Sequence, residues 1–381
     1  MNRPGIVFGG VALAALLLSG CSAPAAPRST SASPTATAAG EATAPSFRLP
    51  LGCDDLVSAA DAESALQAPA TATDWPTSSD HASLADVAIQ NAGGIVCQWA
   101  VDPADFGGQI TATDSPAPRL IVSVLPDAAD AWNPGWQGDA EATETRTFGS
   151  TEAYASCGDI GCRANALVGS NWVNILIYNP GAQVATTSLG TPDETFEHAT
   201  PAFTSIFDHL ASAGEPAPAW IPPTTSSPSP ANCETLFPLA IAASVINAPG
   251  AVDVLPAAED TLPASSTIAL KQAGALTCSY GGPDATAFSA PITVTALPGG
   301  AWVLPKLSSE LPASGTQAAF ALTESATNPA LIWCSENGNL CEVLFSSDGQ
   351  AVSVMSQQFS GATPSARELA TSAAEHIVAL R

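Results

Sequence analysis

The sequence predicts an α+β fold of two tandem duplicated domains, each a mainly antiparallel sheet with helices at both ends of the repeat packed on one face. Three observations predict this fold: similar blocks recur along the chain, four cysteines recur with nearly the same spacing, and each repeat closes with an amphipathic helical pattern. With 381 residues, of which 46% are hydrophobic, the chain is long enough and apolar enough for two ordinary domains joined by linkers.

The repeat is clearest in a block that aligns without a gap, residues 87–99 on residues 268–280. Its matched columns hold a glycine, a cysteine and an aromatic residue: Gly93 with Gly274, Cys97 with Cys278 and Trp99 with Tyr280. Residues 120–126 likewise correspond to residues 292–298, and a tryptophan follows each block, Trp132 and Trp302. A tandem duplication explains these matches.

The first 21 residues predict that the protein is exported to an extracytoplasmic location. Arg3 precedes an apolar run from Ile6 to Leu18, which is too short to span a hydrocarbon core of about 30 Å, and the run ends in Leu-Ser-Gly-Cys at Cys21. This resembles a bacterial lipoprotein signal with its lipobox. The resemblance implies that Cys21 is diacylated on sulfur, with acyl chains such as palmitate, and becomes the mature N-terminus. The alternative is an ordinary secretory signal with an incidental cysteine.

Two low-complexity segments divide the rest of the chain. Residues 22–46 are mostly Ser, Ala, Pro, Thr and Gly, which predicts a disordered tether, and residues 214–230 hold six prolines, which predicts a semi-extended linker. The expected order is therefore signal peptide (1–21), tether (22–46), repeat domain 1 (47–213), linker (214–230) and repeat domain 2 (231–381).

The cysteine spacing supports the alignment of the two repeats and predicts a disulfide framework. Successive cysteines lie 44, 60 and 5 residues apart in the first repeat and 45, 56 and 7 apart in the second, and the eight of them suit an oxidising compartment. Each repeat allows three connectivities, and the short intervals fit a hairpin. The expected bridges are Cys53–Cys97, Cys157–Cys162, Cys233–Cys278 and Cys334–Cys341. Zinc is the rival, but these gaps do not match the usual ligand spacing and no histidine lies nearby, so no metal site is expected.

The elements are expected in the same order in both repeats. A helix begins near Ser58 and near Pro238, with Ser as an N-cap and Pro as a first-turn residue. The expected strands are 95–101, 120–125 and 172–178 in the first repeat and 276–280, 292–297 and 351–355 in the second. Turns at residues 169–171 and 348–349 precede the last strand of each set. The closing helices are expected at 195–211 and 365–380.

Charge excludes some classes of partner. The chain holds 35 acidic and 10 basic residues, with only two lysines, so it lacks the clustered cations that nucleic acid or anionic lipid requires. Residues 48–213 hold 21 acids and 4 bases, and residues 231–381 hold 12 and 4. The two repeats therefore differ in surface charge. This difference suits a cationic partner for one of them, and solubility alone explains the acidity equally well.

Motifs for catalysis are missing from the sequence. The four histidines, His81, His198, His209 and His376, share no column between the repeats, and no metalloprotease, nucleophile-elbow or penicillin-binding signature occurs. No catalytic residue and no cofactor is therefore expected. Asp127 and Asp130 are expected to cap a helix start rather than bind calcium.

The aromatic residues supply the one candidate contact. Trp136 lies on an expected loop and is the candidate ligand-binding residue, whereas Trp132 and Trp302 are expected to be buried because both repeats carry them. Trp99 and Tyr280 are expected to pack near a disulfide. Arg163, beside Cys162, is expected to form a surface ion pair or to meet a carboxylate ligand.

The lipobox, the tether, the cysteine before a short helix, the Cys-x-aromatic strand and the terminal helix together resemble a family. The chain is similar to uncharacterised lipobox-containing lipoproteins of high-GC Gram-positive bacteria and to the disulfide-paired extracytoplasmic sensor domains of bacterial Ser/Thr kinases. The resemblance implies a lipid-anchored protein on the extracytoplasmic face of the cell membrane that binds a ligand or an envelope partner and is not an enzyme. The alternatives are a structural or assembly factor of the cell envelope and an unrecognised hydrolase.

Overall fold

The structure is a computed structural model of the full chain. It describes residues 44–73, 83–101, 118–133, 145–158, 161–178, 189–221, 230–247, 252–255, 265–282, 284–285, 289–308, 317–322, 330–335, 337–358 and 364–380. Residues Glu41–Arg381 form one compact unit. The signal peptide with Cys21, the tether up to residue 43 and residues 222–229 of the linker lie outside the described residues.

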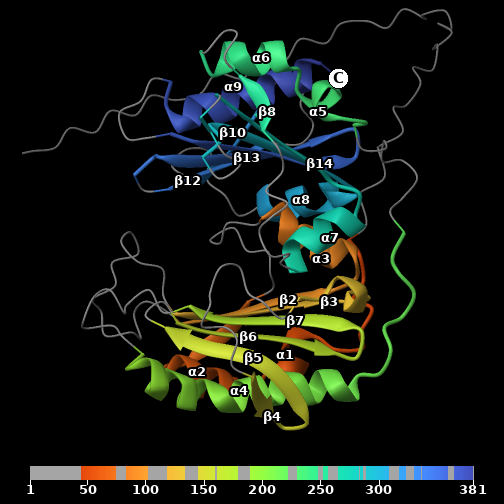
Figure 1. Cartoon of the computed structure of the whole chain (residues 1–381), viewed down its shortest axis with the longest axis vertical. Helices are drawn as coiled ribbons and strands as arrows, with labels where there is room; N and C mark the ends of the chain where they lie inside the picture. Colours follow the sequence, from red (N-terminus) through yellow and green to blue (C-terminus); the bar gives the residue numbers. More distant parts are fainter. Residues whose placement is uncertain are drawn as a thin grey trace, which may run out of the picture. The chain divides into compact units, whose positions relative to one another are not determined.

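The first half of this unit is built on a seven-stranded sheet in the order β1-β2-β3-β7-β6-β5-β4 (Figure 1). The strands are β1 (Ala70–Thr73), β2 (Ile95–Val101), β3 (Arg119–Leu125), β4 (Thr145–Phe148), β5 (Thr151–Gly158), β6 (Gly161–Val168) and β7 (Asn171–Tyr178). Every neighbouring pair is antiparallel. The predicted strands of this repeat are therefore confirmed to within one residue.

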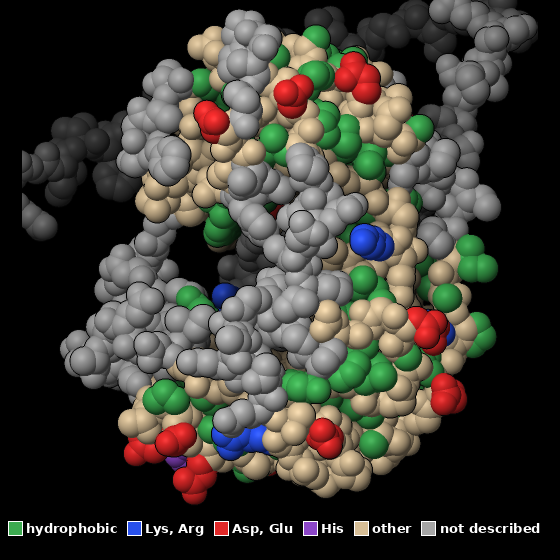
Figure 2. Space-filling model, in the orientation of Figure 1, with side chains coloured by type: hydrophobic (Ala, Val, Ile, Leu, Met, Phe, Trp, Pro, Cys, Tyr) green, Lys and Arg blue, Asp and Glu red, His purple; other side chains and the backbone are tan. Residues whose placement is uncertain are grey.

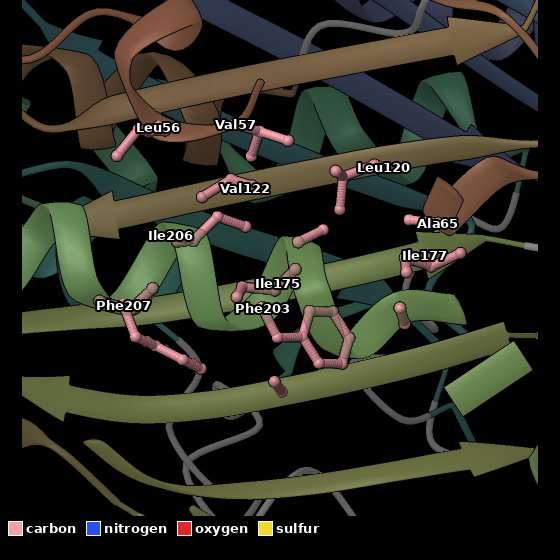
Figure 3. Close-up of a cluster of buried hydrophobic side chains, with 14 of the residues drawn as sticks. Leu56, Val57, Ala65, Leu120, Val122, Ile175, Ile177, Phe203, Ile206 and Phe207 are labelled. Carbon is pink, nitrogen blue, oxygen red and sulfur yellow. The ribbon is translucent and has the colours of Figure 1, made fainter. Parts of the chain in front are cut away.

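Helices from both ends of this half cover one face of its sheet (Figure 1). They are α1 (Cys53–Leu56), α2 (Ala59–Leu66) and α4 (Pro192–Ser212). Phe203, Ile206 and Phe207 of α4 point toward the strands (Figure 3) and are fully buried with the alternate side chains of β3 and β7. Burying a side chain of this kind stabilises the fold by about 1.5–3 kcal/mol. This layer is the helical layer that the sequence predicts.

The second half has its own seven-stranded sheet. Its strands are β8 (Asp253–Leu255), β9 (Leu276–Gly281), β10 (Ile292–Pro298), β11 (Gln317–Phe320), β12 (Ala330–Cys334), β13 (Leu340–Ser347) and β14 (Gln350–Gln357). The helices α5 (Cys233–Leu236), α6 (Leu239–Val245) and α9 (Ala366–Ala379) pack on one face (Figure 1). Read from β8, the strand order is β8-β9-β10-β14-β13-β12-β11, which repeats the order of the first sheet strand for strand.

All four predicted disulfides are present, and each lies within one half. Cys53–Cys97 and Cys233–Cys278 join the first helix of a half to its second strand, with Cα atoms 5.5 and 5.7 Å apart. Cys157–Cys162 and Cys334–Cys341 join residues directly opposite each other in a hairpin. In the chain-entropy model the long loops contribute about 4 kcal/mol each and the short ones about 2 kcal/mol.

The opposite face of each sheet carries further elements, of which sequence reasoning anticipated only a helix start near Asp130. They are α3 (Leu84–Asn91) and the 3₁₀ turn η1 (Ala129–Ala131) in the first half, and α7 (Ser265–Gln272), the 3₁₀ turn η3 (Gly300–Trp302) and α8 (Val303–Ser308) in the second. The matched Gly93 and Gly274 follow α3 and α7 in the left-handed conformation, φ 75° and 68°, which terminates both helices.

These elements form a third hydrophobic cluster that both halves share. From the first half it takes residues of α3, β2, β3 and β7, and from the second half residues of α7, α8, β10 and β13. Helix α3 packs against α7, and α7 also contacts β3 and β7. The two halves are therefore joined by a common core as well as by the linker.

Three smaller predictions are corrected by the structure. Asp127 does not cap a helix, because η1 has Ala128 at its N-cap and no side-chain cap, and Asp127 instead pairs with Arg48. Pro238 is the N-cap of α6 rather than a residue of its first turn. Trp132 and Trp302 are half-buried rather than fully buried, and both pack against the third cluster.

Candidate functional site

The candidate site is the face of each sheet that lies opposite its terminal helix, here called the junction face. Successive side chains along a strand point to opposite faces of the sheet. A strand residue directly next to a core residue of the helical side therefore points to the junction face. One end of each junction face belongs to the third cluster. The other end carries polar, charged and aromatic side chains that belong to none of the three clusters.

On the first sheet, two arginines flank β7 on the junction face. Arg119 of β3 stands opposite Tyr178, and Arg163 of β6 stands opposite Leu176. The Arg119 guanidinium lies 5.3 Å from the centre of the Tyr178 ring, a cation–π contact that holds this side chain against the sheet. All four side chains are half-buried.

On the second sheet, the junction face carries a carboxylate and hydroxyl groups. Glu342 of β13 is only 7% exposed and accepts a hydrogen bond from the Ser353 hydroxyl of β14. The hydroxyls of Thr277 and Thr295 lie 3.1 Å apart across β9 and β10, and a second such pair lies beside them. Glu342 stands opposite Met355, whose side chain is 37% exposed.

The two junction faces differ most at one matched position. Arg163 follows Cys162 in β6, and Glu342 follows Cys341 in β13, so the same place beside the hairpin disulfide holds opposite charges. Strands β2, β3, β6 and β7 contain two arginines and no acidic residue, although this half of the chain is strongly acidic. Acidic side chains are scattered over the surface in Figure 2, while lysine and arginine are few.

The predicted site residues fall in different places. Trp136, the candidate ligand-binding residue, lies outside the described residues. Trp99 is 2% exposed in the first core, and Tyr280 is fully buried and donates to the backbone oxygens of Cys233 and Phe237, at 3.1 and 2.8 Å. Burial, and secondarily Glu234, raises the pKa of Tyr280 above its usual value. Tyr280 therefore lies beside the Cys233–Cys278 disulfide, as predicted, and Trp99 belongs to the same buried cluster as Cys97.

The repeated tryptophans take part in the junction between the halves. The indole N–H of Trp302 donates to Asn91 of α3 over 2.9 Å, and the Asn91 amide donates to the Pro298 oxygen. Gln272 of α7 aligns with Asn91 of α3, and its side-chain amide donates to the backbone oxygen of Asp127 over 3.3 Å. The Trp132 N–H is buried and has no hydrogen-bond partner among the described residues. Trp132 instead lies against Tyr154, with ring centres 6.1 Å apart.

No catalytic group emerges from the described part of the chain. The pKa values of Glu194 and Glu368 are lowered because Thr191 and Ser365 donate hydrogen bonds to them at helix starts, which is a structural role. Within the described ranges no group of three or more His, Cys, Asp or Glu side chains is placed to hold a metal ion.

Sequence reasoning missed Arg119, Tyr178 and Glu342. Glu342 had a usable signal, because the aligned cysteines place it in the column of Arg163. Arg119 and Tyr178 had none, since their contact depends on the register between β3 and β7, which lie far apart in the sequence.

Comparison with known proteins adds no assignment: the chain matches no family model, no curated protein and no solved structure. Searching the described residues for a membrane-spanning helix, long and apolar enough to cross a bilayer, also finds none.

Proposed function

We propose that this protein is a lipid-anchored, extracytoplasmic binding module without enzymatic activity, which presents two junction faces to a ligand or an envelope partner. The observation that carries the proposal is the composition of these faces. Half-buried arginine, tyrosine and leucine on one sheet, and a buried carboxylate with hydroxyls on the other, lie outside all three clusters. Binding sites place a few polar groups among apolar and aromatic side chains, and the first of these faces has this composition.

We further propose that the two halves arose by tandem duplication. The identical strand order, the equivalent disulfides and the matched glycines after α3 and α7 support this origin. Duplication followed by divergence gives two similar scaffolds with different junction faces, which allows one half to acquire a ligand while the other supports it.

The test of binding is native mass spectrometry of the full chain purified from its host membranes in detergent. A bound species that survives purification and is lost on denaturation is expected. If the protein carries no bound species and none can be restored from an envelope extract, the binding proposal is wrong.

The anchoring part of the proposal rests on Cys21. Cys21→Ser removes the thiol that the acyl chains would modify, so the protein should leave the membrane fraction or accumulate as an uncleaved precursor. Fractionation followed by intact-mass measurement decides the question. Unchanged membrane association of Cys21→Ser would exclude a lipid anchor at this residue.

A further inference from the structure

We infer that Arg48 acts as a latch that keeps the two halves of the chain in contact and so controls how far their junction faces are covered. The latch consists of Arg48 and its two side-chain partners, the Asp127 carboxylate and the Ala217 backbone oxygen. The inference goes beyond the proposed function, because it concerns the contact between the halves when no ligand is present. Its consequence for binding rests on that proposal, since the junction faces are the proposed binding surfaces.

The first step is the burial of the Arg48 side chain. Only 10% of this side chain is exposed, and its guanidinium pairs with the Asp127 carboxylate over 2.7 Å. Its Nε–H donates to the Ala217 oxygen. A guanidinium removed from water is stable only with such partners, so Arg48, Asp127 and Ala217 hold one another in place.

The second step is the connection from Arg48 to α3. The Arg48 N–H donates to the oxygen of Gly93, which follows α3 in the left-handed conformation. A Cβ on Gly93 would overlap the Arg48 side chain, so this side chain runs directly across the glycine. Arg48 therefore fixes the end of α3, the helix through which the first half contacts α7.

The third step is the connection to the second half. The side-chain amide of Gln272 in α7 donates to the backbone oxygen of Asp127, whose carboxylate pairs with Arg48. The next residue, Ala128, is fully buried in the third cluster. A displacement of Asp127 would therefore disturb both the hydrogen bond to Gln272 and the packing of Ala128.

The fourth step is the comparison with the matched place in the second half. Residues 120–126 correspond to residues 292–298, so Gly299 takes the place of Asp127. Both residues adopt the left-handed conformation, with φ 53° for Asp127 and 68° for Gly299. Glycine is the residue that adopts this conformation without a steric cost. The first half thus carries a carboxylate at a position that favours glycine, and this carboxylate is the one that Arg48 binds.

The fifth step is the place of the latch in the chain. The predicted tether (22–46) ends two residues before Arg48, and Ala217 belongs to the predicted linker (214–230). The Ala217 N–H also donates to the Arg48 oxygen over 2.8 Å. A change in the direction of either segment would act first on the latch, and Arg48 would transmit it to the contact between α3 and α7.

The experiment is hydrogen–deuterium exchange of the oxidised full chain in detergent, without a ligand. Losing a hydrogen bond to a charged group changes an equilibrium constant by about tenfold. Arg48→Ala should therefore raise the exchange rate of α3, α7 and residues 214–221 by about tenfold. This rise should appear at labelling times at which the terminal helices α4 and α9, on the opposite faces of the sheets, are still protected.

Two milder variants separate the parts of the latch. Arg48→Lys keeps a charge for Asp127 but not the Nε–H that Ala217 accepts, so it should raise exchange in residues 214–221 more than in α3 and α7. Asp127→Asn tolerates the left-handed conformation and weakens only the ion pair, so the rise in α3 and α7 should stay below about fivefold. These variants keep the test valid if Arg48→Ala does not fold.

A double variant tests the connection through Asp127. Gln272→Ala removes the hydrogen bond to the Asp127 oxygen. If Arg48 acts through Asp127, Arg48→Ala combined with Gln272→Ala should raise the exchange of α7 by less than the product of the two single factors. A full product would mean that the two contacts are independent, which contradicts the latch.

The matched control is Arg146→Gln. Arg146 is also an arginine of the first half, and it lies 4.2 Å from the centre of the Phe196 ring, which packs against the core on the helical side of the sheet. This variant should leave the exchange of α3 and α7 unchanged.

Three further outcomes would overturn the inference. One is unchanged exchange of α3 and α7 in Arg48→Ala, and another is the same rise in Arg146→Gln. The third is a rise in α3 and α7 that appears only together with α4 and α9, because the variant would then loosen the whole fold rather than the contact between the halves. No ligand takes part, so failure of the latch leaves the binding proposal standing, and a protein that binds nothing leaves the latch standing.

Discussion

At the scale of single residues, Arg48 joins three segments that are distant in sequence. Its side chain, 10% exposed, pairs with the Asp127 carboxylate over 2.7 Å and donates to the Ala217 oxygen. Its backbone exchanges hydrogen bonds with Gly93 and Ala217, each at 2.8 Å. A Cβ on Gly93 would overlap the Arg48 side chain, so that glycine also makes room for it. Arg48 therefore fastens the start of the first half to the segment that leads into the linker.

Arg48→Ala should lower the free energy of unfolding by about 1–2 kcal/mol, because it removes an ion pair, a hydrogen bond and buried methylene groups. Asp127→Asn is the matched variant, since asparagine tolerates the left-handed conformation that Asp127 adopts, φ 53°. It should cost less than about 1 kcal/mol, because Asp127 is 57% exposed. Urea denaturation measures both values, and equal losses would mean that the ion pair alone holds Arg48.

The paired tryptophans allow a second comparison between single residues. Trp302→Phe removes the N–H that Asn91 accepts and leaves a buried amide oxygen without that donor, which costs about 1–3 kcal/mol. Trp132→Phe removes an N–H that has no partner among the described residues, so its effect should stay within about 0.5–1 kcal/mol. Both changes remove a similar area of indole. Equal losses in urea denaturation would show that the lost packing, and not the hydrogen bond to Asn91, sets the cost at Trp302.

At the scale of secondary structure elements, the two terminal helices begin with the same device. The Thr191 N–H and hydroxyl both donate to Glu194 over 2.9 Å, and the Ser365 groups donate to Glu368 over 2.8 Å. These bonds favour the charged carboxylates and lower their pKa values in the folded state. Their stabilisation is therefore present at neutral pH and is lost as the pH falls below the ordinary value of 4.5 through the lowered pKa values.

Glu194→Gln and Glu368→Gln combined should lower the melting temperature at pH 7 and flatten its decline in acid, because glutamine accepts hydrogen bonds at every pH. Melting curves between pH 7 and 3 check this expectation. Glu375→Gln, an exposed position on α9 that caps no helix end, serves as the control and should leave the decline unchanged. An identical acid profile in the double variant would rule out a contribution from the caps.

The elements also show which parts of the fold were accessible from sequence. The strands, the terminal helices and the disulfides were predictable because each has a local pattern that occurs twice. Helix α3 was not, since all but its Ala85 and Asp86 are buried and it lacks a polar stripe. The arginine pair of the junction face was not predictable either, because strand register brings Arg119 and Arg163 to the same face of β3, β7 and β6.

At the scale of the whole molecule, the shared cluster determines whether the two expected domains can fold separately. Its residues on the second half include Leu297, Val303, Leu304 and Leu307, all buried in the joined chain. Exposing such side chains costs about 1.5–3 kcal/mol each, which is comparable in sum to the 5–15 kcal/mol that stabilises a typical domain. The absence of a disulfide between the halves among these eight cysteines does not make the halves independent.

Residues 44–213 and 231–381, produced separately under oxidising conditions, should therefore keep their own disulfides but bind a hydrophobic dye and melt well below the full chain. Each half has a complete sheet and helical layer, so partial folding is expected, while the junction face is left uncovered. Dye fluorescence, peptide mapping and melting curves measure these properties.

The matched control for this experiment is the full chain with a protease site placed in the linker, cleaved after folding. The two pieces are then separate chains, as the halves are, but retain the third cluster, so they should elute together in size-exclusion chromatography and melt near the intact chain. Separate halves that bind no dye and melt at the temperature of the full chain would show that the shared cluster adds nothing to stability. Cleaved pieces that separate during chromatography would show the same, because the contact between α3 and α7 and the rest of the third cluster would then not hold the halves together.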